Sequence, residues 1–440
     1  MTAPRRQLLF LVLLVVAATT LRLAYAYWVH APGRSVISDM AAYHRQARHL
    51  LDGTLGPDDT FYPIGYPALI AAAYRISSSS LGLLAVVQAI AGGLTCLMAY
   101  LVARRFALPA AWALAAAAIV AAYPPFVFYG SLLLTEAITP LLFTLMIWLL
   151  VRVIETRHWR WAAALGVTFA AASLVRTNFL PFAPVVALCV WTGVGRRWRA
   201  AVWPLSVAAA SAIPLLAVAC TLNSSLTGRW AGPSTNGGVN FFMMHAEVGR
   251  VRYYDWSTGP VRNQLEYSGV YESPVPFYDE PHFYREGVAL MLADPLRAAF
   301  RAADGLRETA GLGRQSYWPN LRLPASDGWR GDVYALLGRA LRFSALAFLF
   351  VLVLPPAIVI AILSARGTIV ECGQVVWMAT AGALAVMFVT SVLFLAEPRM
   401  HVPYDALLIA ASLAAVRRGW LAGGREPGSN LNRAAGNPQY

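Results

Sequence analysis

The sequence predicts an all-α polytopic membrane protein with about ten transmembrane helices, interfacial helices in an extracytoplasmic first loop, and a small extracytoplasmic lobe. Two observations lead to this fold class. Of the 440 residues, 58% are hydrophobic and only 13% are charged, whereas an ordinary soluble domain carries roughly 25% charged residues. Apolar runs of about 20 residues, long enough to cross about 30 Å of hydrocarbon, also recur along the chain. A soluble enzyme is therefore excluded.

The apolar runs divide the chain into membrane helices and two outward segments. We expect membrane helices at 8–29, 81–103, 107–128, 131–151, 160–176, 179–195, 200–222, 339–364, 372–396 and 401–416. The expected regions are 1–29 (first transmembrane helix), 30–80 (extracytoplasmic loop), 81–222 (transmembrane helices 2 to 7), 223–338 (extracytoplasmic lobe), 339–416 (transmembrane helices 8 to 10) and 417–440 (cytoplasmic tail).

Arginine placement orients these helices, because short cytoplasmic loops hold an excess of basic residues. The sequence has no lysine, and fifteen arginines fall on one side of the predicted bundle with only three acids, which accounts for most of the net charge of +13. The arginines are Arg5, Arg6, Arg104, Arg105, Arg152, Arg157, Arg160, Arg196, Arg197, Arg199, Arg366, Arg417, Arg418, Arg425 and Arg433, and the acids are Glu155, Glu371 and Glu426. That side is the expected cytoplasmic side.

The avoidance of lysine and the abundance of alanine indicate a GC-rich bacterial source. The expected location is therefore a bacterial inner (plasma) membrane, crossed many times, with the active site facing the periplasm. No basic stripe interleaved with aromatic residues is visible, so a nucleic-acid partner is not expected.

The N-terminus has a second interpretation. Arg5 and Arg6, the apolar run and Ala24-Tyr25-Ala26 imitate a secretory signal with an A-x-A cleavage site. We favour an uncleaved helix, because the apolar run is long and its removal would leave an odd number of spans.

The four cysteines predict neither a disulfide framework nor a zinc site. Cys96, Cys189, Cys220 and Cys372 lie in or at the ends of apolar runs and show no metal-ligand or CxxC spacing.

The first outward loop contains a predicted interfacial helix from Ser38 to Asp52, because its apolar residues recur at helical spacing opposite arginines and a histidine. Pro67 can open a second short helix that reaches Ile76. In the lobe, a helix-like run extends from Phe283 to Arg307. The lobe has no P-loop, Rossmann fingerprint or HExxH motif, so nucleotide or zinc chemistry has no sequence support.

Ionisable residues gather at the outer ends of the predicted helices, where they are functional candidates by default. They are Asp39, Glu136, Arg176, Glu397, Arg399, His401 and Asp405. Each has a plainer alternative. Asp39 can be a helix N-cap, Glu136 a structural partner of Arg176, and Arg176 a snorkelling side chain. Arg399 and His401 can be loop-surface residues. The convergence of several such residues in one leaflet is what predicts a polar cavity at the outer membrane boundary.

Several short motifs resemble those of the GT-C glycosyltransferases, in the branch that holds protein O-mannosyltransferases and the lipid A aminoarabinose transferase. The motifs are Asp39-x-x-x-Tyr43-x-x-x-Ala47-x-x-Leu50-x-x-Gly53, Tyr62-Pro63-x-Gly65-Tyr66-Pro67, Leu134-Thr135-Glu136, Ser173-Leu174-Val175-Arg176-Thr177, Asn236-Gly237-Gly238-Val239-Asn240-Phe241 and Arg399-Met400-His401-Val402-Pro403. Their order and placement agree over most of the chain. The resemblance implies a multi-spanning enzyme that transfers one sugar from a polyprenyl-phosphate donor to a glycan, lipid or protein acceptor. The transfer is expected on the outer side of the membrane, in contact with membrane lipid.

The resemblance also suggests roles. Asp39 is the expected general base in an inverting transfer, with Arg176, Arg399 and His401 around the donor phosphate. Residues Glu136, Tyr43, Tyr66 and Asn240 are expected to contact sugar or acceptor. Many relatives carry a second acid directly after the loop aspartate, whereas this chain has Met40. We therefore expect a single carboxylate and no required cofactor, although a divalent ion near Asp39 is left open.

Two other classes remain. A transporter or flippase of lipid-linked sugars would also place charges in a multi-spanning bundle, but it tends to show internal repeats and midplane sites, and we detect no repeat. An envelope scaffold protein would need no convergence of polar groups. The sequence identifies neither the sugar nor the acceptor, and it does not give the oligomeric state.

Overall fold

The computed structural model describes residues 3–31, 33, 36, 38–77, 81–246, 250–255, 259–262, 270–272, 275–312, 328–368 and 374–423. Cys372, Glu371, Glu426, Arg425, Arg433 and most of the predicted tail 417–440 lie outside these residues. The structural statements below concern the described part of the chain.

Helices dominate the described residues, which confirms the all-α class. They are α1 (Ala3–Ala24), α2 (Asp39–Asp52), α3 (Gly65–Ser77), α4 (Leu81–Arg105), α5 (Ala110–Ala122), α6 (Pro124–Tyr129), α7 (Thr139–Thr156), α8 (Trp159–Val175), α9 (Ala183–Gly193), α10 (Trp198–Thr227), α11 (Gly237–His245), α12 (Glu280–Ala293), α13 (Pro295–Thr309), α14 (Trp329–Ala347), α15 (Leu354–Ala365), α16 (Val375–Leu393) and α17 (Asp405–Gly423). Shorter 3₁₀ or π segments are η1 (Tyr25–Val29), η2 (Pro57–Thr60), η3 (Thr135–Ala137), η4 (Thr177–Phe182), η5 (Phe348–Val353) and η7 (Pro398–Tyr404).

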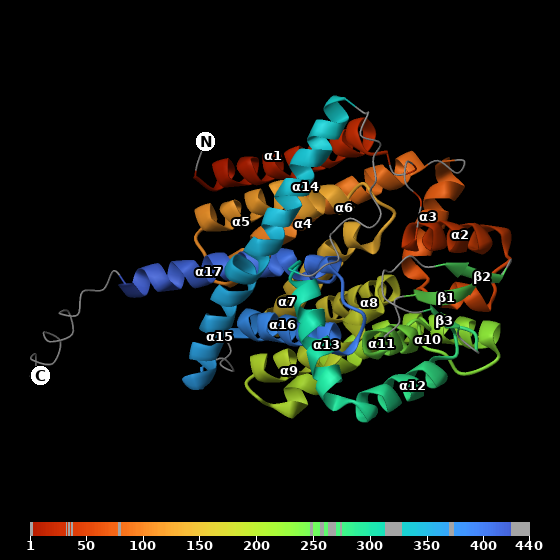
Figure 1. Cartoon of the computed structure of the whole chain (residues 1–440). Helices are drawn as coiled ribbons and strands as arrows, with labels where there is room; N and C mark the ends of the chain where they lie inside the picture. Colours follow the sequence, from red (N-terminus) through yellow and green to blue (C-terminus); the bar gives the residue numbers. More distant parts are fainter. Residues whose placement is uncertain are drawn as a thin grey trace, which may run out of the picture.

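Six helical segments within the described residues are long and apolar enough to cross a membrane, so the chain is polytopic. They are Arg5–Val29, Leu81–Arg105, Thr139–Thr156, Trp198–Thr227, Phe348–Ala365 and Val375–Leu393, and shorter apolar helices are Ala110–Ala122, Trp159–Val175 and Thr177–Gly193. In Figure 1, α1, α4, α5 and α17 run roughly parallel, while α14 crosses them obliquely. The total of ten spans remains a prediction.

Prolines divide several of the predicted helices. The run 107–128 consists of α5 and α6, which meet at the Tyr123–Pro124 bond, and the lobe run 283–307 is broken at Pro295 into α12 and α13. Proline has no N–H group, and it disfavours the helical conformation of the residue before it. The predicted helix 131–151 begins later, with α7 at Thr139, so Glu136 lies on the 3₁₀ turn η3.

The first outward loop is helical where the sequence predicted it. The helix α2 covers Asp39–Asp52 and ends at Gly53, which adopts a left-handed conformation with φ of 69°. The helix α3 covers Gly65–Ser77. Its first residue needs to be small, because a Cβ at Gly65 would lie 2.6 Å from the backbone oxygen of Leu174 in α8. This close approach brings the loop onto the end of α8 that leads to Arg176.

The lobe packs onto the same loop. Phe61 joins Val239 and Phe242 of α11 and Phe277 and Phe283 in one small apolar core, and the backbone N–H of Thr235 donates to the carbonyl of Thr60 at 2.9 Å. Three short strands, β1 (Arg250–Asp255), β2 (Gly259–Arg262) and β3 (Val270–Glu272), add a sheet of order β2-β1-β3. In the view of Figure 1 this sheet is drawn at the same end of the molecule as α2. The lobe and the first loop thus form one end of the bundle.

The close packing of α8 on α10 predicts a sensitivity to one methyl group. A Cβ at Gly166 would overlap the backbone carbonyl of Ala208, whereas a Cβ at Gly338 of α14 would meet open space. We expect Gly166→Ala to destabilise the fold by about 1–3 kcal/mol, since overpacking forces backbone shifts. Thermal unfolding in detergent measures this, with Gly338→Ala as the matched control. An unchanged melting temperature for Gly166→Ala would contradict the packing described for these two helices.

Candidate active site

A carboxylate and an arginine from opposite ends of the sequence meet at the first loop. Arg399 Nη2 donates to Asp39 Oδ2 at 2.5 Å, and the Tyr62 hydroxyl donates to Asp39 Oδ1 at 2.7 Å. Asp39 is the first residue of α2, and the preceding Ser38 has the positive φ of 52°. The carboxylate of Asp39 is therefore oriented by a cation and a phenol, and the N-cap position of α2 belongs to Ser38.

A second ion pair lies directly against the first. Arg176 Nη1 donates to Glu136 Oε1 at 2.7 Å, and the same carboxylate oxygen lies 3.8 Å from Arg399 Nε. Glu136 therefore connects the two arginines. Arg399 Nε also pairs with Glu397. We call Asp39, Glu136, Arg176, Glu397 and Arg399 the ionic cluster.

The exposed fractions give the cluster a direction. The side chain of Glu136 is 1% exposed, that of Arg176 12%, that of Arg399 16% and that of Asp39 20%. Glu136 is thus the most buried member of the cluster, and Glu397, at 26%, and Asp39 are its most exposed members. A substrate that approaches from the lobe end would reach Asp39 and the two arginines before it reached Glu136.

Local backbone structure explains how the arginines are placed. Arg176 follows the last residue of α8 in an extended conformation with φ of −152° and ψ of 110°, which turns it out of the helix. Arg399 lies in η7, which begins at Pro398 and contains Pro403. The two segments touch where an Nη2 atom of Arg176 contacts the sulfur of Met400. The lobe holds the chain before η7, because Leu395 donates its backbone N–H to the carbonyl of Asn240 at 3.0 Å.

Three tyrosines pack beside Asp39. The Tyr43 ring lies 4.8 Å from the Tyr62 ring and 5.3 Å from the Tyr66 ring, measured between centroids. The Tyr66 hydroxyl donates to Gln88 Oε1 at 2.6 Å, and Gln88 donates to the carbonyls of Gly130 and Leu132. Burial raises the pKa of Tyr43 and of Tyr66. Both phenols are therefore neutral hydrogen-bonding groups at physiological pH.

Burial and neighbouring charges shift the pKa values of Asp39 and Arg399 in opposite directions. Burial raises the pKa of Asp39, but the Arg399 charge and the hydrogen bonds from Tyr62 and Arg399 outweigh it, so the net pKa is lowered. Burial lowers the pKa of Arg399, whereas Glu397, Asp39 and Glu136 together raise it well above the ordinary value. Asp39 is therefore ionised, and Arg399 remains a cation.

His401 lies away from the carboxylate of Asp39. Its ring is fully buried, with Nδ1 2.8 Å from the carboxylate of Asp405, and it stacks on Phe348 at 3.9 Å between centroids. These contacts stabilise the junction of η7 with α17. A direct contact of His401 with a donor phosphate remains a prediction.

Sequence reasoning missed three side chains of the site. Tyr62 and Gln88 were not candidates, because a neutral phenol and amide give no charge signal. Arg22 was also missed, although it is the only charged residue in the apolar stretch 7–29. A charged residue within a membrane helix is a functional candidate by default. Within the described residues there is no group of three or more His, Cys, Asp or Glu side chains that could hold a metal ion.

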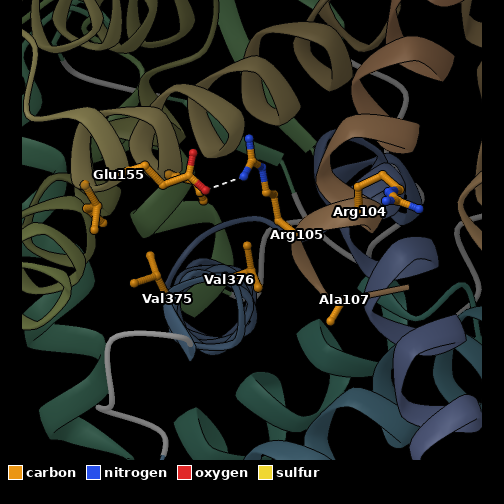
Figure 2. A pocket seen from close by; sticks show the side chains of 8 residues that line it. Arg104, Arg105, Ala107, Glu155, Val375 and Val376 are labelled. Carbon is orange, nitrogen blue, oxygen red and sulfur yellow. Dashed lines mark hydrogen bonds and ion pairs between the residues drawn. The ribbon is translucent and has the colours of Figure 1, made fainter. Parts of the chain in front are cut away.

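One hollow in the described structure lies away from the ionic cluster. Figure 2 shows it between the ends of α4 and α7 and the start of α16, where Arg105 pairs with Glu155. Its volume is about 220 Å³. Arg417 donates to the carbonyl of Ala107 at this same end. These residues belong to the predicted cytoplasmic side, and none of them is a member of the ionic cluster.

Comparison with known proteins supports the fold. The chain matches the crystal structure of the Archaeoglobus fulgidus oligosaccharyltransferase in the apo form with a TM-score of 0.52 and 16% identity, over 94% of this chain and 51% of that chain. The chain has the GT-C fold. A second structure, the archaeal oligosaccharyltransferase AglB from Archaeoglobus fulgidus with an inhibitory peptide and a dolichol-phosphate, matches at a TM-score of 0.48 and 14% identity, over 96% and 52% of the two chains.

The family model described as dolichyl-phosphate-mannose-protein mannosyltransferase matches residues 62–220 of this chain. No curated protein matches it. The chain spans about half the length of the solved structures it resembles.

The opposing effects on Asp39 predict a change in the pH dependence of stability. With Arg399 present, the lowered pKa of Asp39 makes its stabilising contribution complete above an ordinary pKa of about 3.9, and this contribution is lost as the pH falls further. In Arg399→Gln the charge and the hydrogen bond of Arg399 are lost. Burial, the largest single effect, still raises the pKa of Asp39 against the Tyr62 hydrogen bond and the Arg176 charge, so we expect this pKa to rise above the ordinary value. We expect the melting temperature of this variant to fall, relative to wild type, as the pH is raised from about 4 to 8.

The control for this measurement is the double variant Arg399→Gln/Asp39→Asn, in which the additional slope should vanish. Equal pH slopes for wild type and Arg399→Gln would show that Arg399 does not hold the charge of Asp39.

Proposed function

We propose that this protein is an integral membrane glycosyltransferase that transfers a single sugar from a polyprenyl-phosphate donor to an acceptor on the extracytoplasmic face, with inversion at the anomeric carbon. The observation that carries the proposal is the ionic cluster at one end of the membrane bundle, in which the partly exposed carboxylate of Asp39 pairs with Arg399 and Glu136 connects Arg399 to Arg176. The family match to residues 62–220 supports it, since that model is described by a dolichyl-phosphate-mannose-dependent activity.

In this mechanism Asp39 is the general base. The acceptor hydroxyl transfers its proton to Asp39 while its oxygen attacks the anomeric carbon. The bond between that carbon and the phosphate oxygen breaks, and its electron pair goes to the lipid phosphate. Because phosphate is a stable anion, it needs no proton from a general acid. One displacement inverts the anomeric centre, and no covalent intermediate is required.

Arg176 and Arg399 would bind the departing phosphate. Guanidinium groups match phosphate oxygens in two-point contacts, and both arginines retain exposed surface. Glu136 would fix their spacing, since its Oε1 faces both. A phosphate that engages Arg399 would also weaken the hold of this cation on Asp39. Donor binding would thus raise the pKa of Asp39 and make it a stronger base at the moment the acceptor arrives.

The environment of α2 favours one catalytic carboxylate. Met40, at the position where many relatives have a second acid, is fully buried. Tyr43 and Tyr66 are buried rings that contact each other, and Tyr43 also contacts Tyr62, the partner of Asp39. Asn240 lies on the lobe segment that binds the chain before η7. We assign Tyr43, Tyr66 and Asn240 to the sugar or acceptor side, and we place His401 behind Arg399, in support of the phosphate-binding turn.

A transporter or flippase of lipid-linked sugars is the alternative. It would require polar groups along a path through the bundle. The ionic cluster instead lies at the end formed by the first loop, η7 and the lobe, which favours transfer. The family model that matches residues 62–220 is described by a dolichyl-phosphate-linked sugar, so we propose a lipid-linked donor here and leave the acceptor class open between glycan, lipid and protein.

The base assignment predicts a large loss of activity in Asp39→Asn. We expect the rate of sugar transfer by the purified variant to fall about 10²–10⁴-fold, the usual range for loss of a general base. The readout is product formation from a polyprenyl-phosphate sugar, with the melting temperature as a folding check. Asp52→Asn, at the exposed end of the same helix, is the matched control and should retain wild-type turnover. Full activity in Asp39→Asn would remove Asp39 from the mechanism.

The phosphate-binding role predicts weaker use of the donor by Arg176→Ala. The loss of one charge-assisted contact, worth about 1.5–3 kcal/mol, corresponds to roughly a 10–100-fold rise in donor KM or fall in kcat/KM. The acceptor KM should change much less. Steady-state kinetics with the donor and the acceptor varied separately measure both, and an unchanged donor kcat/KM would rule out contact of Arg176 with the phosphate.

A further inference from the structure

A second buried cation lies behind the ionic cluster. Arg22 of α1 falls inside the membrane-spanning segment Arg5–Val29, and its side chain is 1% exposed. A charged group at such a depth is costly unless it is satisfied or has a function. Arg22 is not part of the mechanism proposed above.

Helix capping satisfies part of the guanidinium. Arg22 Nη1 donates to the carbonyls of Ala18 at 2.9 Å and Ala121 at 3.2 Å, and Nη2 donates to the carbonyl of Val120 at 3.1 Å. Val120 and Ala121 lie in the last turn of α5, whose final carbonyls have no intrahelical partner because the chain breaks at Pro124. These bonds explain three N–H groups of Arg22, but they do not neutralise its charge.

Arg22 shares a cavity with one member of the cluster. Its Nε is buried without a hydrogen-bond partner, and no acid of the described residues pairs with it within 4.0 Å. Arg22 and Glu136 instead line one cavity of about 10 Å³, together with Gln88. That volume accommodates about one water molecule. Gly92 makes room for this arrangement, because a Cβ there would collide with the Arg22 side chain.

The charges of the cluster do not balance without Arg22. Three carboxylates, those of Asp39, Glu136 and Glu397, face two arginines, Arg176 and Arg399. The cluster alone therefore carries an excess negative charge, which opposes the binding of an anionic lipid phosphate. Arg22 is a further cation that lines a cavity together with Glu136, and charges interact more strongly in a medium of low dielectric constant than in water.

We propose that Arg22 is a positioning residue for the donor phosphate, and this inference rests on the proposed function. Arg22 does not touch the donor. Its positive charge offsets the negative charge of Glu136, so that Glu136 can hold Arg176 and Arg399 in place without repelling the phosphate that these arginines bind. The hydrogen bonds to the last turn of α5 fix the position of the guanidinium group of Arg22.

The test compares Arg22→Gln with Arg22→Lys in the purified full-length protein. We expect Arg22→Gln to raise the donor KM roughly tenfold, which corresponds to about 1.4 kcal/mol, with kcat changed much less. Arg22→Lys retains the charge and should restore most of the donor affinity. A merely structural role would lower the melting temperature of both variants without this difference in KM.

Gly93→Ala is the matched control for packing. Its Cβ would collide with Thr19 of α1, so it disturbs the same α1–α4 contact without removing a charge. We expect a lower melting temperature and an unchanged donor KM. An unchanged donor KM in folded Arg22→Gln, or an equal rise in Gly93→Ala, would overturn the proposal.

A double-variant cycle tests the link to Glu136. If the two groups act together, the effects of Arg22→Gln and Glu136→Gln on donor KM will not add, whereas two independent structural roles give additive effects. Additivity would overturn the proposal.

Equilibrium binding of a polyprenyl phosphate without sugar, measured on the same variants, separates this inference from the proposed function. Weaker binding in Arg22→Gln than in Arg22→Lys supports the role of Arg22 even if no sugar transfer is detected. Equal binding to the two variants contradicts that role even if wild-type protein transfers sugar.

Discussion

The carboxylate of Glu136, shared between Arg176 and Arg399, is the interaction on which the rest of the site depends. It joins a turn before α7, the end of α8 and the 3₁₀ segment η7. Breaking such a buried network leaves uncompensated charges, and that penalty is larger than the net gain from forming the network. The network therefore specifies where Arg399 lies, and Arg399 in turn specifies the position and ionisation of Asp39.

Interrupted helices position the residues of this network. The helix α8 stops at Val175 so that Arg176 can turn inward, Pro398 opens η7, and Pro124 ends α5 inside the membrane region. Each interruption frees backbone groups that a continuous helix would satisfy, and neighbouring groups have to replace those bonds. Arg22 does this for α5. The polar site and the broken helices are thus two consequences of the same architecture.

The sequence predicted the parts of this arrangement that periodicity and topology determine. The helical spacing from Met40 to Leu51 placed α2 correctly, and assigning both Asp39 and Arg399 to one side of the bundle was enough to expect them together. The pairing of Glu136 with Arg176 was anticipated as the plainer alternative for those two residues, and the structure contains that ion pair.

Other features depend on side-chain direction and local backbone, which periodicity does not encode. The inward orientation of His401 toward Asp405 follows from the 3₁₀ turn of η7. The late start of α7 removed Glu136 from the helix in which it was expected. Tyr62, on the segment that leads into α3, donates to Asp39, and this partnership depends on how the first loop folds back on itself.

The most direct test of the central claim is a structure of the wild-type protein with a polyprenyl phosphate bound. The account predicts the phosphate at the ionic cluster, within hydrogen-bonding distance of Arg176 and Arg399, with Asp39 facing the open side from which an acceptor hydroxyl arrives. A phosphate held at another place in the bundle, with the Arg399–Asp39 pair untouched, would contradict it.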